Sequence, residues 1–526
     1  MRSGRGVFGF LPLFLKRRGQ PAGHEGTRRP IDTLTSLDHP GCSDPCGTSA
    51  PGVGVDIESL VRSLSQRSRL VVDSSLNIVD AVEKYAKDAA AKNDAYRYGK
   101  APVPVTIGPT VETSPAHVLH ELGVATTLLT ASPLAQVARH WAHVRYCATL
   151  TRRRGTLGLT PSAQNLVYHH KVTQSEQLGI GLALVVAKKV LQRQYRQWTF
   201  FAVDAEVALK AGFIDGAGAV ERTTKSQKRP DYFLVGHHSS GRRSRMKIVV
   251  LECKGTHQPP SFAYGQLARA AVQVRTLNVG GRRPPALMVA SCLAGRQITS
   301  YVLDPPGDDE LWDGGPDDFD ELLHGRPEDH HWRTRPATAD EARTWPAAVG
   351  DAGPPGTIGP EPTDELPPGA PEVFDVPEER RGWFTQILTR AVAATALLFA
   401  GDSATARHYA TPRQRGDEEP HSGQLRLFEL DPSWAASTAT SQPVADDLRA
   451  EGTLYRAPLP NGKTLDVFRG VESSLYRHLA DGQVAAYLRA APLIRHRWAR
   501  SRPRDGVVSL GRDGTVLAIR VTERRR

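Results

Sequence analysis

The sequence is poor in cysteine, with 5 cysteines among 526 residues. They stand at positions 42, 46, 147, 253 and 292, and so few scattered thiols exclude a disulfide scaffold in a chain of this length. Cys42 and Cys46 lie near His39, but no second Cys/His pair at ligand spacing follows, which argues against a zinc site. This usage is typical of a reducing cytosol, so we expect a cytoplasmic protein.

Long apolar runs are also missing from the two segments that most resemble membrane spans. The run from Val7 to Leu15 is too short to cross a bilayer and has no small-residue cleavage site after it, so secretion is not predicted. The run from Ala391 to Ala400 follows Arg390 within one amphipathic pattern, which predicts a core helix. We therefore expect no membrane partner.

Several recognition motifs are absent as well. The chain has no internal repeat, helix-turn-helix, zinc finger or aromatic-rich RNA-binding signature. The sequence from Asn461 to Thr464 resembles the end of a phosphate-binding P-loop but lacks the upstream glycine. Neither a P-loop nucleotide site nor sequence-specific recognition is predicted.

Positive charge is abundant but unevenly distributed. The net charge is +11, yet residues 304–381 hold 21 Asp and Glu against 6 Arg, which leaves about +26 on the remainder. A basic surface suits a polyphosphate partner, because neutralising phosphates releases condensed counterions. The same positive charge would also be explained by good solubility alone, so charge does not identify the partner.

The chain is too long for one hydrophobic core, and its patterns predict several units. We expect a disordered arm over 1–54, a helical region over 55–165, an α/β domain over 170–305, an acidic Pro/Gly-rich linker over 306–375 and an α+β region over 376–526. The predicted fold class is α/β, with a mixed sheet flanked by helices, a helical N-terminal region and a small α+β C-terminal region. This organisation leaves open a homo-oligomer or a regulatory partner.

The hydrophobic pattern also predicts individual elements. Within the α/β domain we expect helices at 174–195 and 262–278, and strands near 198–209, 231–237, 246–254, 285–293 and 297–304. Ser114 and Pro115 form an N-cap and first-turn pair for an earlier helix. Later in the chain we expect helices at 383–400 and 472–490, and hairpins at Asn461-Gly462 and Asp513-Gly514.

The most informative feature is a buried strand that ends in charged residues. The run from Ile248 to Leu251 is apolar, as in a strand buried on both faces, and it continues directly into Glu252, Cys253 and Lys254. Glu252 and Lys254 share one face, and Cys253 points to the other. Pairing 231–237 with 247–253 about a polar turn places Asp231 opposite Glu252 and Lys254.

Charges at the end of a central strand need a partner, since carboxylates and ammonium groups are seldom buried alone. Two close carboxylates repel each other unless a divalent cation lies between them, and oxygen ligands favour Mg²⁺, for which Mn²⁺ can substitute. A metal held by Asp231 and Glu252 would activate a water, with Lys254 orienting that water or neutralising a phosphate.

Pro230-Asp231, followed by Glu252-Cys253-Lys254 on the next strand, resembles the signature of the PD-(D/E)xK nuclease superfamily. The resemblance covers residues 170–305 and includes the order of helix, strand hairpin, helix and strand. It implies a restriction endonuclease-like core in which Asp231 and Glu252 hold the metal, the Cys253 backbone carbonyl adds a ligand, and Lys254 assists the nucleophilic water. The family often carries an acid on the first helix and a glutamine on the next, here best matched by Glu176 and Gln266.

These two weaker matches have structural alternatives. Thr173 and Glu176 also form a Thr-x-x-Glu capping box, which would explain Glu176 without a catalytic role. Gln266 shares a helical face with Gln273, and glutamine on an exposed face is ordinary.

Basic residues near the hairpin fall into two groups. Those that immediately precede Asp231 are predicted phosphate contacts, namely Arg222, Lys225, Lys228 and Arg229. At the other end of the hairpin, His237 and His238 are predicted to be solvated loop residues. Arg242, Arg243 and Arg245 lie in the turn, where we expect a solvated tip or a remote backbone contact.

The expected function is a Mg²⁺-dependent nuclease that hydrolyses phosphodiester bonds in DNA, and the family resemblance implies a role in restriction, phage defence or repair. Three alternatives remain. One is a nuclease fold without catalysis that binds DNA or assembles with other proteins. The second is an RNA nuclease, because the metal chemistry is common to both substrates. The third is a basic helical scaffold in which the paired charges are coincidental.

Overall fold

The computed structural model describes residues 56–91, 102–127, 135–211, 221–222, 229–240, 243–305, 374–411, 414, 439–459, 462–498, 501 and 506–523. All of these residues belong to one compact unit, Val55–Arg526. The predicted arm over 1–54 lies outside the described residues, as does the predicted linker apart from its last two positions. The domain boundaries predicted near 165 and 305 fall inside this unit.

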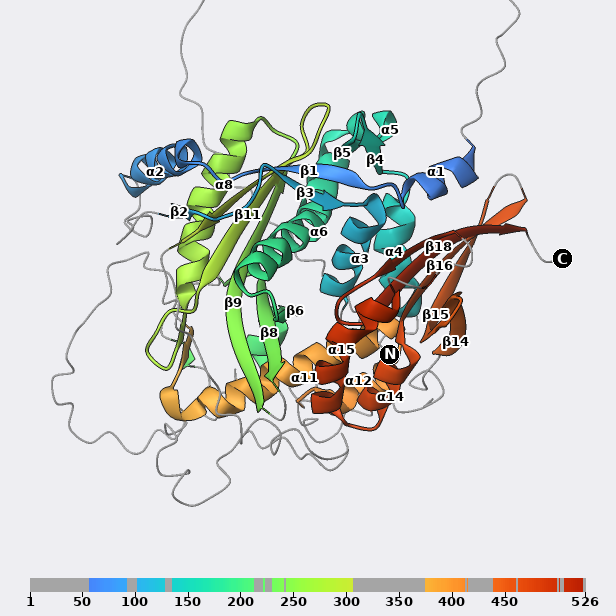
Figure 1. Ribbon diagram of the computed structural model, residues 1–526. Coiled ribbons are helices and arrows are strands. Elements are labelled where there is room, and N and C mark those ends of the chain that lie inside the picture. Colours follow the sequence, from blue (N-terminus) through green and yellow to red (C-terminus); the bar gives the residue numbers. More distant parts are fainter. Residues whose placement is uncertain are drawn as a thin grey trace, which may run out of the picture. The chain divides into compact units, whose positions relative to one another are not determined.

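A mixed sheet of ten strands is the largest feature of the described structure (Figure 1). Its strands follow the order β4-β5-β1-β12-β11-β9-β8-β6, with β2 beside β12 and β3 beside β1. Three pairs are parallel, β1 with β12, β1 with β5 and β9 with β11, and the others are antiparallel. Its strands are β1 (Ser68–Asp73), β2 (Val103–Pro104), β3 (Thr110–Thr113), β4 (Leu150–Arg153), β5 (Thr156–Leu159), β6 (Thr199–Asp204), β8 (Tyr232–Ser240), β9 (Arg243–Thr256), β11 (Ala286–Cys292) and β12 (Thr299–Asp304).

Two long helices, α6 (Tyr168–Gln194) and α8 (Pro260–Gln273), pack on opposite faces of this sheet (Figure 1). The alternation of β9 explains the arrangement, since Ile248 and Val250 join the core that contains α8, whereas Val249 and Leu251 join the core that contains α6. The predicted α/β fold with a mixed sheet flanked by helices is therefore confirmed at this level.

Shorter helices complete this part of the chain. They are α1 (Ile57–Ser63), α2 (Leu76–Ala90), α3 (Pro115–Ala125), α4 (Ala135–Tyr146), α5 (Pro161–Gln164), α7 (Ala205–Lys210) and the 3-10 turn η2 (Val274–Thr276). The start of α3 agrees with the prediction, because the Ser114 hydroxyl accepts a hydrogen bond from the His117 amide at 3.2 Å and Pro115 opens the first turn.

The prediction of a helical region over 55–165 is wrong in one respect. The first five strands lie there and join the sheet. Of these, β1 pairs with β3 and β5, and it also pairs with β12 from the later part of the chain. In β1, buried and more exposed residues alternate, which is the pattern of a half-buried strand. The helical pattern of α1 and α2 is thus interrupted by a short strand whose partner β12 lies far along the chain.

The end of one predicted strand inside the α/β region also differs from the structure. The strand expected over 198–209 ends at Asp204, whose carboxylate accepts a hydrogen bond from the Val207 amide at 3.1 Å and thereby caps α7. The segment from Ala205 onward is therefore helical.

The C-terminal region forms a second sheet, antiparallel and five-stranded, in the order β14-β15-β16-β18-β17. Its elements are β14 (Thr440–Ala445), β15 (Leu448–Pro458), β16 (Lys463–Glu472), α14 (Ser473–Ala480), α15 (Val484–Trp498), β17 (Val507–Leu510) and β18 (Thr515–Glu523). Both predicted hairpins form, with Gly462 and Gly514 at positive φ in their turns. The helix expected over 472–490 is two helices, α14 and α15.

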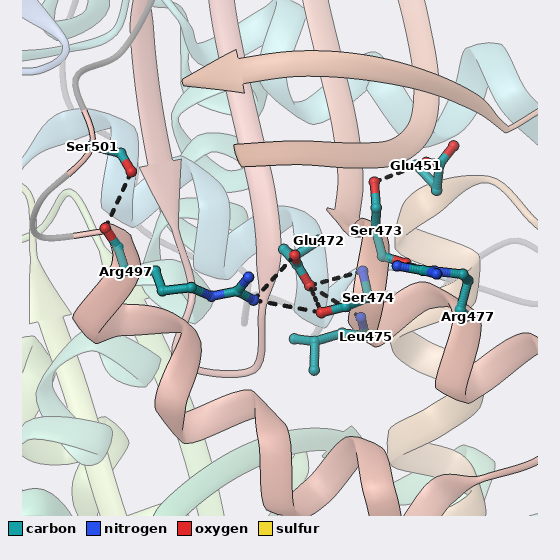
Figure 2. Close-up of polar contacts among 8 residues, drawn as sticks. All are labelled: Glu451, Glu472, Ser473, Ser474, Leu475, Arg477, Arg497 and Ser501. Carbon is teal, nitrogen blue, oxygen red and sulfur yellow. Dashed lines mark hydrogen bonds and ion pairs between the residues drawn. The ribbon is translucent and has the colours of Figure 1, made fainter. Parts of the chain in front are cut away.

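Glu472 joins these elements, as Figure 2 shows. One of its carboxylate oxygens accepts hydrogen bonds from the Ser474 and Leu475 amides and so caps α14. The other oxygen accepts from the Arg497 guanidinium on α15 at 3.2 Å. The end of β16 is thereby linked to both helices.

One helix packs between the two sheets. The helix α11 (Arg381–Ala400) follows β13 (Phe374–Val376) and the 3-10 turn η4 (Glu378–Arg380), precedes α12 (Ser403–Tyr409), and contacts β6 and β16. The segment Glu378–Ala400 is long and apolar enough to cross a membrane, but 78% of that apolar window is buried inside the protein. Its burial agrees with the predicted core helix.

A third sheet, small and three-stranded, joins β10 (Leu277–Val279), β13 and β7 (Glu221–Arg222).

The C-terminal sheet packs against α3 through a buried histidine. His120 places Nδ1 at 3.1 Å from the Ser509 hydroxyl and Nε2 at 2.9 Å from the Thr515 hydroxyl. Burial lowers the pKa of His120 to about 4, although the nearby carboxylate of Asp513 acts in the opposite direction. The folded protein therefore holds this imidazole neutral, whereas the unfolded chain protonates it near its ordinary pKa of 6.5.

We expect the free energy of unfolding to fall as the pH drops from about 6.5 to 4, because the unfolded state binds more protons there. Replacing His120 with Gln keeps a donor and an acceptor but removes the titration. The slope should then decrease by up to about 1.4 kcal/mol per pH unit. Urea unfolding at several pH values measures this slope. The exposed His408→Gln change on α12 is the control, and an unchanged slope in His120→Gln would refute the assignment.

Candidate active site

The structure brings Asp231, Glu252 and Lys254 together at the end of two adjacent strands. Tyr232 of β8 pairs with Leu251 of β9, and the two strands are antiparallel. Asp231, which precedes Tyr232, therefore lies opposite Glu252, which follows Leu251. The Asp231 amide donates to Glu252 Oε2 at 3.1 Å, and Asp231 Oδ2 accepts from the Cys253 amide at 2.8 Å. Lys254 Nζ hydrogen-bonds Glu252 Oε1 and lies 3.7 Å from Asp231 Oδ2. This is the convergence that the hairpin register predicts.

Burial makes the electrostatics of this cluster unusual. Glu252 is 0% exposed, and its pKa is raised to about 8 by burial and then by the like charge of Asp231. Burial by itself lowers the pKa of Lys254, but the carboxylates of Glu252 and Asp231 outweigh it and the net shift is upward. The Lys254 ammonium thus stabilises the carboxylate pair.

A cleft of about 930 Å³ opens at these strand ends. Its lining includes Asp231 from the start of β8, Lys254 from β9, Glu176 from α6 and Gln266 from α8. Four of the five predicted catalytic side chains therefore share one cavity. Glu252 does not line it and lies in contact with Asp231 and Lys254.

The helix α6 begins earlier than predicted, and this removes the capping alternative for Glu176. The N-cap position is Val167, so Thr173 lies inside the helix, where its hydroxyl donates to the His169 carbonyl at 3.2 Å. Tyr168, Lys171, Val172 and Glu176 all line the cleft, at the spacing of one helix face. Glu176 is therefore a cleft residue and not part of a cap.

Two glycines let α6 approach β9 closely. A Cβ on Gly179 would lie 3.0 Å from the Gly255 backbone, and a Cβ on Gly255 would lie 1.8 Å from the Ser175 carbonyl oxygen. Neither neighbour is a flexible side chain, so only glycine fits at this crossing. The contact positions the first half of α6, with Glu176, beside the strand that carries Glu252 and Lys254.

The two predicted glutamines of α8 have different roles. Gln266 Nε2 donates to the Gly255 carbonyl at 3.3 Å, while its buried Oε1 has no hydrogen-bond partner among the described residues. Gln273 Nε2 instead donates to the Arg229 carbonyl at 3.4 Å, and so supports the segment that leads into Asp231. Gln266 thus offers an unused acceptor in a residue that lines the cleft.

Of the four predicted phosphate contacts, the structure places one at the cleft. Arg229 lines it and forms an ion pair with Glu206, which lines it as well. The backbone of Arg222 lies in β7 and pairs with Phe374, but its side chain is outside the described part of the chain. Lys225 and Lys228 lie outside it entirely.

Several cleft residues were not predicted. They are chiefly Asp204, Glu206, Lys171 and His257. Asp204 follows a buried apolar run just as Glu252 does, so the same signal was present in the sequence. Burial raises the pKa of the Asp204 carboxyl. His257 is held by a 2.8 Å hydrogen bond between its Nε2 and Gln174 Oε1.

The residues predicted to bind magnesium form only a small set of ligands. No group of three or more His, Cys, Asp or Glu that could hold a metal occurs among the described residues. Mg²⁺ nevertheless often takes only one or two carboxylates and completes its shell with water and phosphate oxygens. Asp231 and Glu252 supply two carboxylates in contact with one cation, Lys254, and the carbonyl of Cys253 stays the predicted third ligand. Carboxylate and carbonyl oxygens are the ligand types that Mg²⁺ and Mn²⁺ take.

Comparison of the chain with family models, with curated proteins and with solved structures finds no match.

Proposed function

We propose that the protein is a Mg²⁺-dependent nuclease that hydrolyses phosphodiester bonds in DNA. The observation that supports this most strongly is the convergence of Asp231, Glu252 and Lys254 beside a cleft that Glu176 and Gln266 also line. Each residue type alone is common at a strand end. Their combination around a buried carboxylate with a raised pKa is typical of a functional site.

The order of elements supports a restriction endonuclease-like core of the PD-(D/E)xK type. The helix α6 precedes the antiparallel hairpin of β8 and β9, which carries the charged residues, and α8 then leads to β11 in parallel with β9. This is the order that the sequence resemblance implies. On this proposal, β1 to β5 and the C-terminal sheet are additions to that core.

On this proposal, the side chains of the site have different roles in catalysis. Asp231 and Glu252 would hold the cation, with the Cys253 carbonyl as a further ligand. A bound Mg²⁺ would supply an activated water and offset charge on the phosphate. Lys254 would then leave the carboxylate pair and orient the water or neutralise a phosphate oxygen. Gln266 Oε1 could accept a hydrogen bond from that water, and Arg229 could exchange Glu206 for a phosphate.

One observation favours a binding module without catalysis. Glu252 has no exposed surface and is already neutralised by Lys254, so the cluster can persist without a metal. Against this, burying a carboxylate whose pKa is raised to about 8 destabilises the fold, and an apolar residue would avoid that cost. An RNA nuclease would use the same groups, and only the substrate separates it from a DNA nuclease.

The test is cleavage by the purified full-length chain of supercoiled plasmid and of matched DNA and RNA strands, with Mg²⁺, Mn²⁺ or EDTA. We expect DNA cleavage with either metal and none with EDTA. Cleavage of RNA alone would replace the proposed substrate. If neither nucleic acid is cut with any metal, the catalytic proposal fails and the binding module takes its place.

A further inference from the structure

A second cleft, of about 660 Å³, lies at the other end of the β8–β9 hairpin. It is formed by the turn after α6, the end of β8, helix α15 and the β17–β18 turn. Asp231 and His238 are seven residues apart on or next to β8, which places the two clefts about 23 Å apart along the strand. The two sites are therefore separate, and no residue lines both.

The second cleft is strongly basic. The charged residues that line it are Arg196, Arg489, Arg495 and Arg512, with three histidines beside them and no Asp or Glu among the described lining residues. Arg196 and Arg495 are exposed, and within the described structure neither forms an ion pair with a carboxylate. Burial, and then the neighbouring charge of Arg495, lower the pKa of Arg512 to about 10. Within the described structure, the charges of Arg196 and Arg495 are therefore not balanced by a carboxylate in an ion pair.

A neighbouring arginine in this region is paired with a carboxylate. Arg497 lies two residues after Arg495 on α15, and it is paired with Glu472 at 3.2 Å (Figure 2). It does not line the cleft. Among the described residues, a carboxylate pairs with Arg497, whereas none forms an ion pair with the exposed cleft residues Arg196 and Arg495.

An aromatic side chain indicates which polyanion would bind. Trp198 lines the cleft, is partly exposed, and stacks on His238 with ring centroids 5.5 Å apart. The Lys247 ammonium lies 5.6 Å from the Trp198 ring centre. Trp198 also stacks on Phe200, with ring centroids 6.5 Å apart, so these aromatic side chains form one cluster at the cleft. Cations beside aromatic side chains are characteristic of nucleic-acid grooves. An acidic peptide or a lipid headgroup would use the arginines but would not need the aromatic ring.

We propose that this cleft binds the sugar–phosphate backbone of nucleic acid, remote from the Asp231 cluster. The binding requires no metal and no chemistry at the first cleft, so it goes beyond the nuclease function. The cleft lies at the turn end of the hairpin, where the sequence predicts two solvated loop histidines. That prediction is wrong for His237, which is buried within β8.

The test is fluorescence anisotropy of labelled duplex and single-stranded DNA in EDTA, with the full-length chain at several salt concentrations. We expect Arg196→Glu together with Arg495→Glu to weaken binding at least about tenfold and to reduce the slope of log K against log salt by about one for each lost phosphate contact. Arg477→Glu, at an exposed residue of α14 outside the cleft (Figure 2), reverses one charge and is the matched control for each of the two cleft substitutions made singly. Its dissociation constant should stay within about twofold of the wild type.

Three results would overturn the inference: unchanged binding in the cleft variant, equal weakening in Arg477→Glu, or competition by polyglutamate as strong as by DNA of the same charge. The corresponding Arg→Gln variants and thermal unfolding check that lost binding does not reflect lost folding. Binding is read without metal, so a chain that binds here but cuts nothing would refute the nuclease proposal and leave this one standing.

Discussion

Glutamine in place of Glu252 is expected to reduce metal-dependent cleavage at least about a thousandfold, because it removes one of two anionic metal ligands. The glutamine has nearly the same shape, and it keeps an acceptor for the Asp231 amide. The initial rate of plasmid cleavage measures the loss, and calorimetric titration with Mg²⁺ should show weaker binding. Glu379→Gln, an exposed carboxylate in η4, makes the same charge change and should cleave as the wild type does.

The same substitution has two opposing effects on stability, so we expect only a small change in the thermal midpoint. The ionised Glu252 is unfavourable in the folded state, because burial and Asp231 raise its pKa to about 8, and glutamine removes that charge. Glutamine also removes the acceptor of the Lys254 ammonium, since its one oxygen is needed by the Asp231 amide. A Glu252→Gln variant that cuts at the wild-type rate would exclude Glu252 as a ligand, whereas an unfolded variant would show that its role is structural.

Alanine in place of Gly255 is expected to destabilise the fold by at least about 3 kcal/mol, or to prevent folding. Its Cβ would lie 1.8 Å from the Ser175 carbonyl oxygen and 3.2 Å from the Gly179 Cα, and neither atom can move without shifting α6. Because this crossing positions Glu176, activity should be lost together with stability.

Urea unfolding measures the effect of Gly255→Ala. The control is Gly382→Ala in the first turn of α11, where nothing lies within 4 Å of the added Cβ. That change should be neutral or stabilising by up to about 1 kcal/mol, because alanine favours the helix. If Gly255→Ala is as stable as the wild type, the close contact between α6 and β9 does not hold the helix in place.

The centre of the site could be predicted from the sequence because its geometry is local. Asp231 and Glu252 lie on consecutive antiparallel strands, so the alternation of side chains and one hairpin register are enough to place them together. The buried run before Glu252 supplied the second signal, since charges rarely end such a strand without a partner.

Other parts were missed because their signals were weak or misleading. The N-cap of α6 is Val167, which makes no side-chain capping hydrogen bond. Thr173 and Glu176 have the sequence pattern of a capping box, but they lie inside the helix. The helix α7 has only six residues, too few for a helical period, so Asp204 was placed inside a longer strand. The strand β1 depends on Val71 pairing with Thr299, a contact that no local pattern contains.

The most direct test of the central claim is metal-dependent DNA cleavage by the wild type and by Lys254→Ala, measured side by side with Mg²⁺, Mn²⁺ and EDTA. Lys254 lines the cleft and contacts both carboxylates, so its loss should abolish cutting even when Mg²⁺ still binds. We predict cutting by the wild type with either metal, none with EDTA, and none by the folded variant. Equal cutting by both proteins, or by neither, would contradict a nuclease site at Asp231, Glu252 and Lys254.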